Sequence, residues 1–157
     1  GPRGETLRDR ALAHLQQTLE REMPITRAMG IVVASYDNGR LAMRMPLEAN
    51  RNHQYSAFAG SLNALCTVVG WGTVFLLLQQ ESLDGNIVIR RGKIRYLRPV
   101  RTPEFVAMGL TMATDDVDYF FELLRSKGRS KIDISVDIAD EKGPYVHFTG
   151  SYVVQNA

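Results

Sequence analysis

The sequence predicts an α+β domain in which an antiparallel β-sheet packs around one long buried helix. The first observation is an uncharged segment from Asn52 to Gln80, which is too long for a strand. The second is a set of runs with β-branched or alternating residues on both sides of that segment. The third is that most of these runs are joined by short turns, which favours antiparallel pairing with one sheet face on the helix.

The elements follow one another in a regular order. An amphipathic helix is predicted over residues 6–23, with Thr6 and Asp9 as a capping box and Pro24 at its end. The buried helix is predicted over about 58–80, and a shorter helix over 115–127 is followed by a stop at Gly128. Strands are predicted over residues 31–36, 41–45, 87–98, 104–113, 131–140 and 145–154. The first two strands are joined by Asn38-Gly39, a pair typical of a tight hairpin.

The composition is that of a single soluble domain spanning residues 1–157. The chain is 45% hydrophobic and 23% charged, so a core can form without disulfides or a structural metal. The net charge of +2 is too small to favour nucleic acid or an anionic membrane as a partner. Cys66 is the single cysteine, which favours a reducing, cytoplasmic location. We expect residues 1–5 to be a tag remnant or a disordered start, because Gly1-Pro2 lacks an initiator methionine.

The uncharged segment is long enough to be considered as a membrane span. Polar and small residues are spread along it, namely Ser61, Asn63, Thr67, Gly70, Gly72 and Thr73. A helix that is apolar all round can equally form the centre of a globular domain. We therefore expect a core helix and no membrane span.

Several short blocks occur in an order that resembles a known family. They are Met23-Pro24, Met29-Gly30-Ile31, Pro46-Leu47, Asn50-Arg51-Asn52-His53, Phe58-Ala59-Gly60-Ser61-Leu62, Gly70-Trp71-Gly72 and Arg95-Tyr96-Leu97-Arg98-Pro99-Val100. Together they resemble the hotdog fold of acyl-CoA and acyl-carrier-protein thioesterases. Within that fold they are most similar to the thioesterase-like domain at the C-terminus of YiiD-type acetyltransferases.

The resemblance implies a sheet wrapped around a central helix and an acyl-thioester substrate. The acyl carrier would be coenzyme A or acyl carrier protein, and no cofactor is implied other than coenzyme A as part of the substrate. The resemblance also implies a homodimer or higher homo-oligomer, in which subunits pair their sheets side by side and each site lies between subunits.

The start of the buried helix is the predicted site. Backbone N–H groups at a helix N-terminus can stabilise the oxyanion of a reacting thioester, and we predict those of Gly60 and Ser61 for this role. Asn52 matches a family asparagine by spacing and is predicted to position water or the carbonyl group. Alternatively, Gly60 is small for packing and the Asn52 amide only bonds its own turn. His53 is predicted to contact substrate, with a plain loop histidine as the alternative.

Two departures from the family pattern leave the chemistry open. Phe58 stands where relatives have a histidine, and their helical Asp or Glu falls near Thr67 or Val68, neither of which can act as a general base. A carboxylate could come from a second subunit, with Glu48, Asp84 and Glu104 as candidates. The alternative function is a non-catalytic module that binds acyl-CoA or an acyl carrier. Ser61 and Cys66 are interpreted as structural rather than nucleophilic.

An apolar acyl tunnel is predicted along the buried helix, because a pocket beside such a helix must be mostly apolar. Its predicted lining is Phe58, Leu62, Trp71 and Phe75. Asn63 and Thr67 are predicted as polar substrate contacts on the same helix. Three scattered histidines and one cysteine have no metal-ligand spacing, so no metal is expected.

A basic strip follows the buried helix. It consists of Arg90, Arg91, Lys93, Arg95, Arg98 and Arg101. We predict that Arg90, Arg91 and Lys93 bind the phosphates of coenzyme A or the acidic surface of an acyl carrier protein. The alternative is that these cations protect an edge strand from aggregation. Nucleic acid is not expected, because aromatic residues are not interleaved with the cations.

Overall fold

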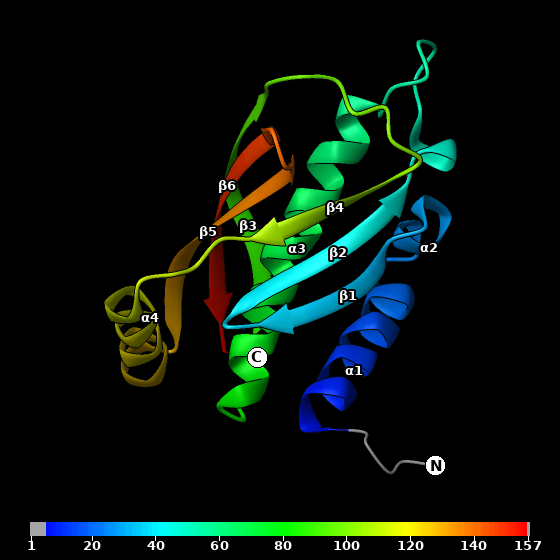
Figure 1. Cartoon of the computed structure of the whole chain (residues 1–157). Helices are drawn as coiled ribbons and strands as arrows, with labels where there is room; N and C mark the ends of the chain where they lie inside the picture. Colours follow the sequence, from blue (N-terminus) through cyan, green and yellow to red (C-terminus); the bar gives the residue numbers. More distant parts are fainter. Residues whose placement is uncertain (1–5, 157) are drawn as a thin grey trace.

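The computed structural model describes residues 6–156, so the expected tag remnant at residues 1–5 lies outside the described part. Helices and strands alternate as predicted (Figure 1). The elements are α1 (Leu7–Glu22), α2 (Ile25–Met29), β1 (Val32–Asp37), β2 (Arg40–Pro46), the 3₁₀ turn η1 (Glu48–Asn50), α3 (Ala59–Gln80), β3 (Asn86–Tyr96), β4 (Glu104–Gly109), α4 (Thr114–Lys127), β5 (Arg129–Asp140) and β6 (Gly143–Gln155).

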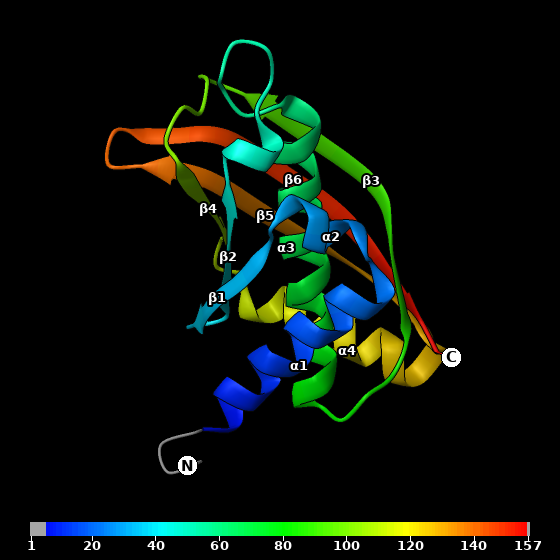
Figure 2. The ribbon, with the colours of Figure 1, turned by 90° about the vertical axis from the view of Figure 1, so that its right-hand side faces the viewer.

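The six strands form one antiparallel sheet in the order β1-β2-β4-β5-β6-β3. The sheet curves around α3, which runs along its concave face (Figures 1 and 2). The strands β1 and β3 are its two edges. The predicted α+β architecture, a sheet wrapped around a central helix, is therefore confirmed.

The two faces of the sheet differ because side chains alternate along each strand. On β5, Ile132, Ile134 and Val136 are buried, whereas the alternate residues Lys131 and Asp133 are exposed. The buried residues join the same hydrophobic cluster as the core residues of α1, α3 and α4. The outer face of β5 is consequently polar at Lys131 and Asp133.

The helix α3 forms the centre of this cluster. It is long and apolar enough to cross a membrane, but 72% of its most apolar window is buried inside the protein. Tyr152 from β6 donates a hydrogen bond of 2.7 Å to the carbonyl oxygen of Thr67. The interpretation of α3 as a core helix is confirmed.

Local sequence signals set several element ends. Thr6 and Asp9 form the predicted capping box at the start of α1. Asn38 and Gly39 both have positive φ angles, of 53° and 73°, as the hairpin between β1 and β2 requires.

Two features differ from the prediction. The helix α2 was missed, because five residues are too few to show helical periodicity. The strand predicted over 104–113 ends at Gly109, because the chain then leaves the sheet to begin α4 at Thr114.

Candidate functional site

The N-terminus of α3 meets the loop before it and the end of β3 at one end of the molecule (Figure 2). A shallow cavity of about 380 Å³ lies at this junction. It is lined by Asn52, Ser56, Ala57, Ala59, Leu62, Tyr96, Leu97, Arg98 and Pro99. Three of the blocks that carry the family resemblance therefore come together here, although the third is far from the other two in sequence.

The first turn of α3 offers backbone donors to this cavity. Phe58 precedes the helix and makes no side-chain capping bond. Within residues 6–156, the N–H groups of Ala59 and Gly60 have no acceptor, whereas the N–H of Ser61 donates to the Phe58 carbonyl oxygen at 3.0 Å. The two unpartnered donors are thus those of Ala59 and Gly60, one position earlier than the predicted pair.

Gly60 lies beneath the ring of Phe58. A Cβ atom at position 60 would be 2.5 Å from Cε2 of Phe58, which is closer than side chains pack. The Phe58 side chain is 56% exposed, so the ring is held by little else. The absence of a side chain at Gly60 therefore lets the Phe58 ring lie against the first turn of α3.

Asn52 is fixed by hydrogen bonds within its own loop. Its Oδ1 accepts from the backbone N–H groups of Gln54, at 2.9 Å, and Ser56, at 3.1 Å. Its Nδ2 donates to Ser56 Oγ at 3.0 Å. The second hydrogen on Nδ2 has no acceptor in the described part of the chain. The turn-forming alternative for Asn52 is present in the structure, and one donor on the amide remains open.

The opposite wall of the cavity comes from the chain leaving β3. Tyr96 donates its hydroxyl to the carbonyl oxygen of Ala59 at 3.2 Å. Arg98 binds the Asp140 carboxylate with two guanidinium nitrogens, and Tyr145 donates to the same carboxylate at 2.9 Å. The hydrogen bonds from Arg98 hold the pKa of Asp140 well below its usual range. This wall was missed in the sequence, although Tyr96 and Arg98 lie inside one of the resembling blocks.

No free carboxylate lines the cavity as the described residues place it. Asp140 is bound by Arg98, and Glu48 and Glu104 lie 3.5 Å from Arg51 and 3.7 Å from Arg44 respectively. The third candidate base, Asp84, follows the opposite end of α3. A single chain therefore presents donors for an oxyanion but no evident base.

Other predicted residues lie further along α3. Thr67 donates to Asn63 Oδ1 at 3.2 Å, and both side chains are half-buried. Trp71 and Phe75 stack with ring centroids 5.4 Å apart. At 1.5 Å per residue they lie about 14 and 20 Å beyond Leu62 along the helix. The four predicted tunnel residues are thus spread along the helix, and only Leu62 lines the cavity at its N-terminus.

The remaining candidates are on the surface. His53 is exposed at the turn after Asn52. Arg90, Arg91 and Lys93 lie on the edge strand β3 and do not line the cavity at the helix N-terminus. Burial raises the pKa of Cys66 to about 12, which keeps this thiol protonated. Residues 6–156 contain no group of three or more His, Cys, Asp or Glu side chains that could hold a metal ion.

The wrapped sheet, the buried helix and the open donors at the start of that helix define a thioesterase-like protein of the hotdog fold. Residues 12–156 match the family described as "Putative thioesterase (yiiD_Cterm)". The chain belongs to this family, and the resemblance found in the sequence is confirmed.

Solved structures agree with this assignment. A protein of unknown function from Chlorobaculum tepidum is 29% identical, with a TM-score of 0.90 over 96% of this chain and 97% of its own. A protein from Shewanella oneidensis, described as a putative thioesterase, is 31% identical, with a TM-score of 0.84 over 94% of this chain and 99% of its own. A thioesterase from Haemophilus influenzae shares the fold at 16% identity, with a TM-score of 0.65 over 92% of this chain and 90% of its own.

Proposed function

We propose that the protein hydrolyses an acyl thioester at the N-terminus of α3. The observation that carries this proposal is the pair of unpartnered N–H groups of Ala59 and Gly60 beside the cavity that contains Asn52. When water adds to the carbonyl carbon of a thioester, negative charge develops on the carbonyl oxygen. Two N–H groups at the positive end of a 22-residue helix would stabilise that charge. The C–S bond then breaks, and the sulfur leaves as a thiol after taking a proton.

The carrier of the acyl group would be coenzyme A or acyl carrier protein. Leu62, Tyr96 and Leu97 give the cavity an apolar side on which an acyl chain can begin. An acyl transferase would use the same donors with another acceptor in place of water. A cytoplasmic location fits the single buried thiol of Cys66.

Water would be positioned by an amide rather than activated by a carboxylate of the same chain. The open Nδ2 hydrogen of Asn52 can bind the substrate carbonyl or water, because its other contacts hold the amide in place. Asn63 and Thr67 form a second polar pair on the half-buried side of the helix. Neither pair supplies a strong base, so the proton acceptor is expected from a second subunit.

We propose a homodimer built through β3. This edge strand has eleven residues, pairs only with β6, and exposes Val88 and Ile89 at one end and Tyr96 at the other. A two-fold axis that joins two identical edges in one sheet makes the new pair antiparallel. The start of one β3 would then approach the end of the other. Asp84, two residues before β3, is the candidate base that such pairing carries toward the second chain's cavity.

The second candidate function is a binding module that holds an acyl carrier without cleaving it. The absence of a free carboxylate among the residues that line the cavity favours this alternative. Both functions need the same cavity, so binding alone does not separate them.

Release of free thiol from a panel of acyl-CoA esters, followed with a thiol-reactive dye, separates the two functions. Hydrolysis that is lost in an Asp84→Asn variant but unchanged in Glu48→Gln would support the shared site. Saturable binding of acyl-CoA without turnover at any chain length would refute hydrolysis and leave the binding module. Sedimentation equilibrium at micromolar concentration tests the dimer directly, and a monomer with full activity would refute the shared site.

A further inference from the structure

A second cavity lies on the outer face of the sheet, at the end of β3 opposite the α3 site. It has a volume of about 360 Å³ and is formed by β3, β5 and β6. Its lining residues are Asn86, Val88, Ile89, Arg90, Arg129, Val153 and Gln155. No carboxylate is among them. The proposed site of thioester cleavage shares none of these residues.

The two arginines reach this cavity from strands on either side of β6. The register between β3 and β6 shifts between Ile89 and Arg91, so Arg90 is the extra residue of a β-bulge. A bulge re-aims the side chain that it inserts, and Arg90 lines the same cavity as the outer-face residues Val88 and Val153. Arg129 approaches from the start of β5, opposite Gln155.

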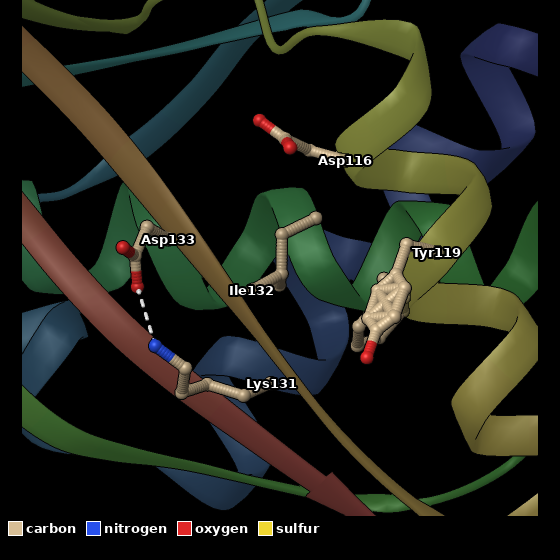
Figure 3. A pocket seen from close by; sticks show the side chains of 6 residues that line it. Asp116, Tyr119, Lys131, Ile132 and Asp133 are labelled. Carbon is tan, nitrogen blue, oxygen red and sulfur yellow. Dashed lines mark ion pairs between the residues drawn. The ribbon is translucent and has the colours of Figure 1, made fainter.

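Neither guanidinium is neutralised. Within residues 6–156, Arg90 and Arg129 make no ion pair and no side-chain hydrogen bond. The neighbouring Lys131 provides a contrast, because its ammonium lies 3.6 Å from Asp133 (Figure 3). Both guanidiniums therefore remain available to an anion bound in this cavity.

We propose that this cavity binds the phosphate groups of a nucleotide. Arginine suits phosphate because its planar fork can donate two hydrogen bonds to one phosphate group. Asn86 and Gln155 add carboxamide donors and acceptors that can pair with the edge of a base. Val88 and Val153 provide an apolar floor for a ring. Inorganic phosphate would use only the arginines, whereas a nucleotide uses the whole lining.

Coenzyme A carries such a nucleotide at the end remote from its thiol. The assignment to coenzyme A rests on the proposed function, whereas the assignment to a nucleotide does not. At about 3.3 Å per residue, Arg90 and Tyr96 lie about 20 Å apart along β3. The cavity therefore suits the part of a long substrate that is remote from a thioester bound at the site of the same chain. Any dimer contact through the open edge of β3 leaves the outer face accessible.

Calorimetric titration of the full chain with coenzyme A, dephospho-coenzyme A, ADP and inorganic phosphate tests the proposal. We expect Arg90→Gln and Arg129→Gln each to weaken coenzyme A binding about tenfold, since each removes a charge-assisted hydrogen bond. Lys127→Gln removes an exposed cation two residues from Arg129 without touching the cavity, and should change the affinity less than twofold. Equal losses in all three variants, or no loss in any, would overturn the proposal.

The ligand series identifies the source of the phosphate. Tighter binding of coenzyme A than of dephospho-coenzyme A would assign the cavity to the 3′-phosphate, and equal binding of both and of ADP would assign it to the diphosphate. Inorganic phosphate that competes as well as ADP would overturn the assignment to a nucleotide.

Hydrolysis of an S-acyl-N-acetylcysteamine, which has no nucleotide, separates this proposal from the proposed function. We expect Arg90→Gln and Arg129→Gln to raise KM for acyl-CoA about tenfold and to leave hydrolysis of the short thioester unchanged. An equal loss on both substrates would overturn the nucleotide site while hydrolysis stands. If neither substrate were hydrolysed while coenzyme A binding still depended on both arginines, the proposed hydrolysis would be refuted and the nucleotide site would be supported.

Discussion

Gly60 and Gly70 lie on the same helix, α3, but their surroundings differ. A Cβ at Gly70 would be 2.1 Å from the hydroxyl oxygen of Tyr152, whose side chain is fully buried. The three atoms nearest to a Cβ at Gly60 all belong to the exposed ring of Phe58. The middle of α3 therefore lacks a side chain so that Tyr152 can pack against it, whereas its first turn lacks one at an exposed position beside the candidate site. Glycine thus serves core packing at position 70, whereas we interpret Gly60 as giving a ligand access to the helix N-terminus.

The largest effect is expected at Gly70. Gly70→Ala would displace Tyr152 and its 2.7 Å hydrogen bond to the Thr67 carbonyl. Overpacking of a core costs about 1–3 kcal/mol and the lost hydrogen bond about 1 kcal/mol more, partly offset by the helix propensity of alanine. We expect a net loss of about 2–3 kcal/mol, or a fall in Tm of about 5–10 °C. Thermal unfolding measures it.

Gly92→Ala is the matched control for Gly70→Ala. A Cβ there would meet Ile89 and Phe148 at 3.5 Å, which is ordinary contact. Its Tm should stay within about 2 °C of the unaltered protein, because substitutions away from tight contacts are within about 0.5 kcal/mol. If Gly70→Ala were as stable as Gly92→Ala, the claim that Gly70 is needed for packing against Tyr152 would be wrong.

Gly60→Ala should lower kcat/KM and leave Tm nearly unchanged. The new methyl group would push the Phe58 ring across the helix N-terminus and obstruct the Ala59 and Gly60 donors. Losing one oxyanion donor lowers kcat by about 10²–10³-fold, so we expect kcat/KM to fall about 100-fold with little change in Tm. The measurement is acyl-CoA hydrolysis beside thermal unfolding.

Recovery of activity in the double variant Phe58→Ala/Gly60→Ala would attribute the loss to the displaced ring. A fall in Tm like that of Gly70→Ala would make both glycines packing residues.

The sequence was sufficient for most of the fold because its signals are local. The capping box at Thr6, the hairpin at Asn38-Gly39 and the alternation on β5 each depend on neighbouring residues. The end of β4 at Gly109 was not predictable in this way, because Thr111 and Met112 would suit a strand. Their position is set by the path that the chain takes to α4.

The candidate site was only partly predictable. The candidate site at Asn52 and Gly60 was proposed from spacing and from the resemblance to a family. Two features depend on how the chain folds and could not be predicted. The N–H of Ser61 donates to the Phe58 carbonyl oxygen, and Arg129 lines the same cavity as Arg90. Nothing in a run of six cations shows which of them lack a partner in the folded protein.

Asn52→Ala distinguishes a functional amide from one that only forms a turn. It removes the open Nδ2 donor and also the hydrogen bonds to Gln54 and Ser56. We expect kcat/KM to fall about tenfold, the loss of one hydrogen bond to the reacting group. Ser56→Ala removes the Oγ contact but leaves Asn52 in its turn, and should change kcat/KM less than threefold. Equal effects of the two substitutions on kcat/KM would mean that Asn52 serves the loop alone.

The smallest effect at neutral pH is expected at Asp140, whose pair with Arg98 holds the cavity wall at the surface. Both side chains are partly exposed, at 24% and 32%, so the ion pair is screened by water. The pKa of Asp140 is lower in the folded protein than in the unfolded chain, where it is about 3.9. The pair therefore stabilises the fold above about pH 4, and this contribution is lost as the pH falls toward the lower, folded pKa. Asp140→Asn should lower Tm by the same small amount from about pH 5 to 8, and the difference should shrink below about pH 4. A Tm difference that stays constant down to about pH 2 would show that the Arg98 contact acts through packing on Tyr145, whose ring lies 3.8 Å below the guanidinium carbon, and not through charge.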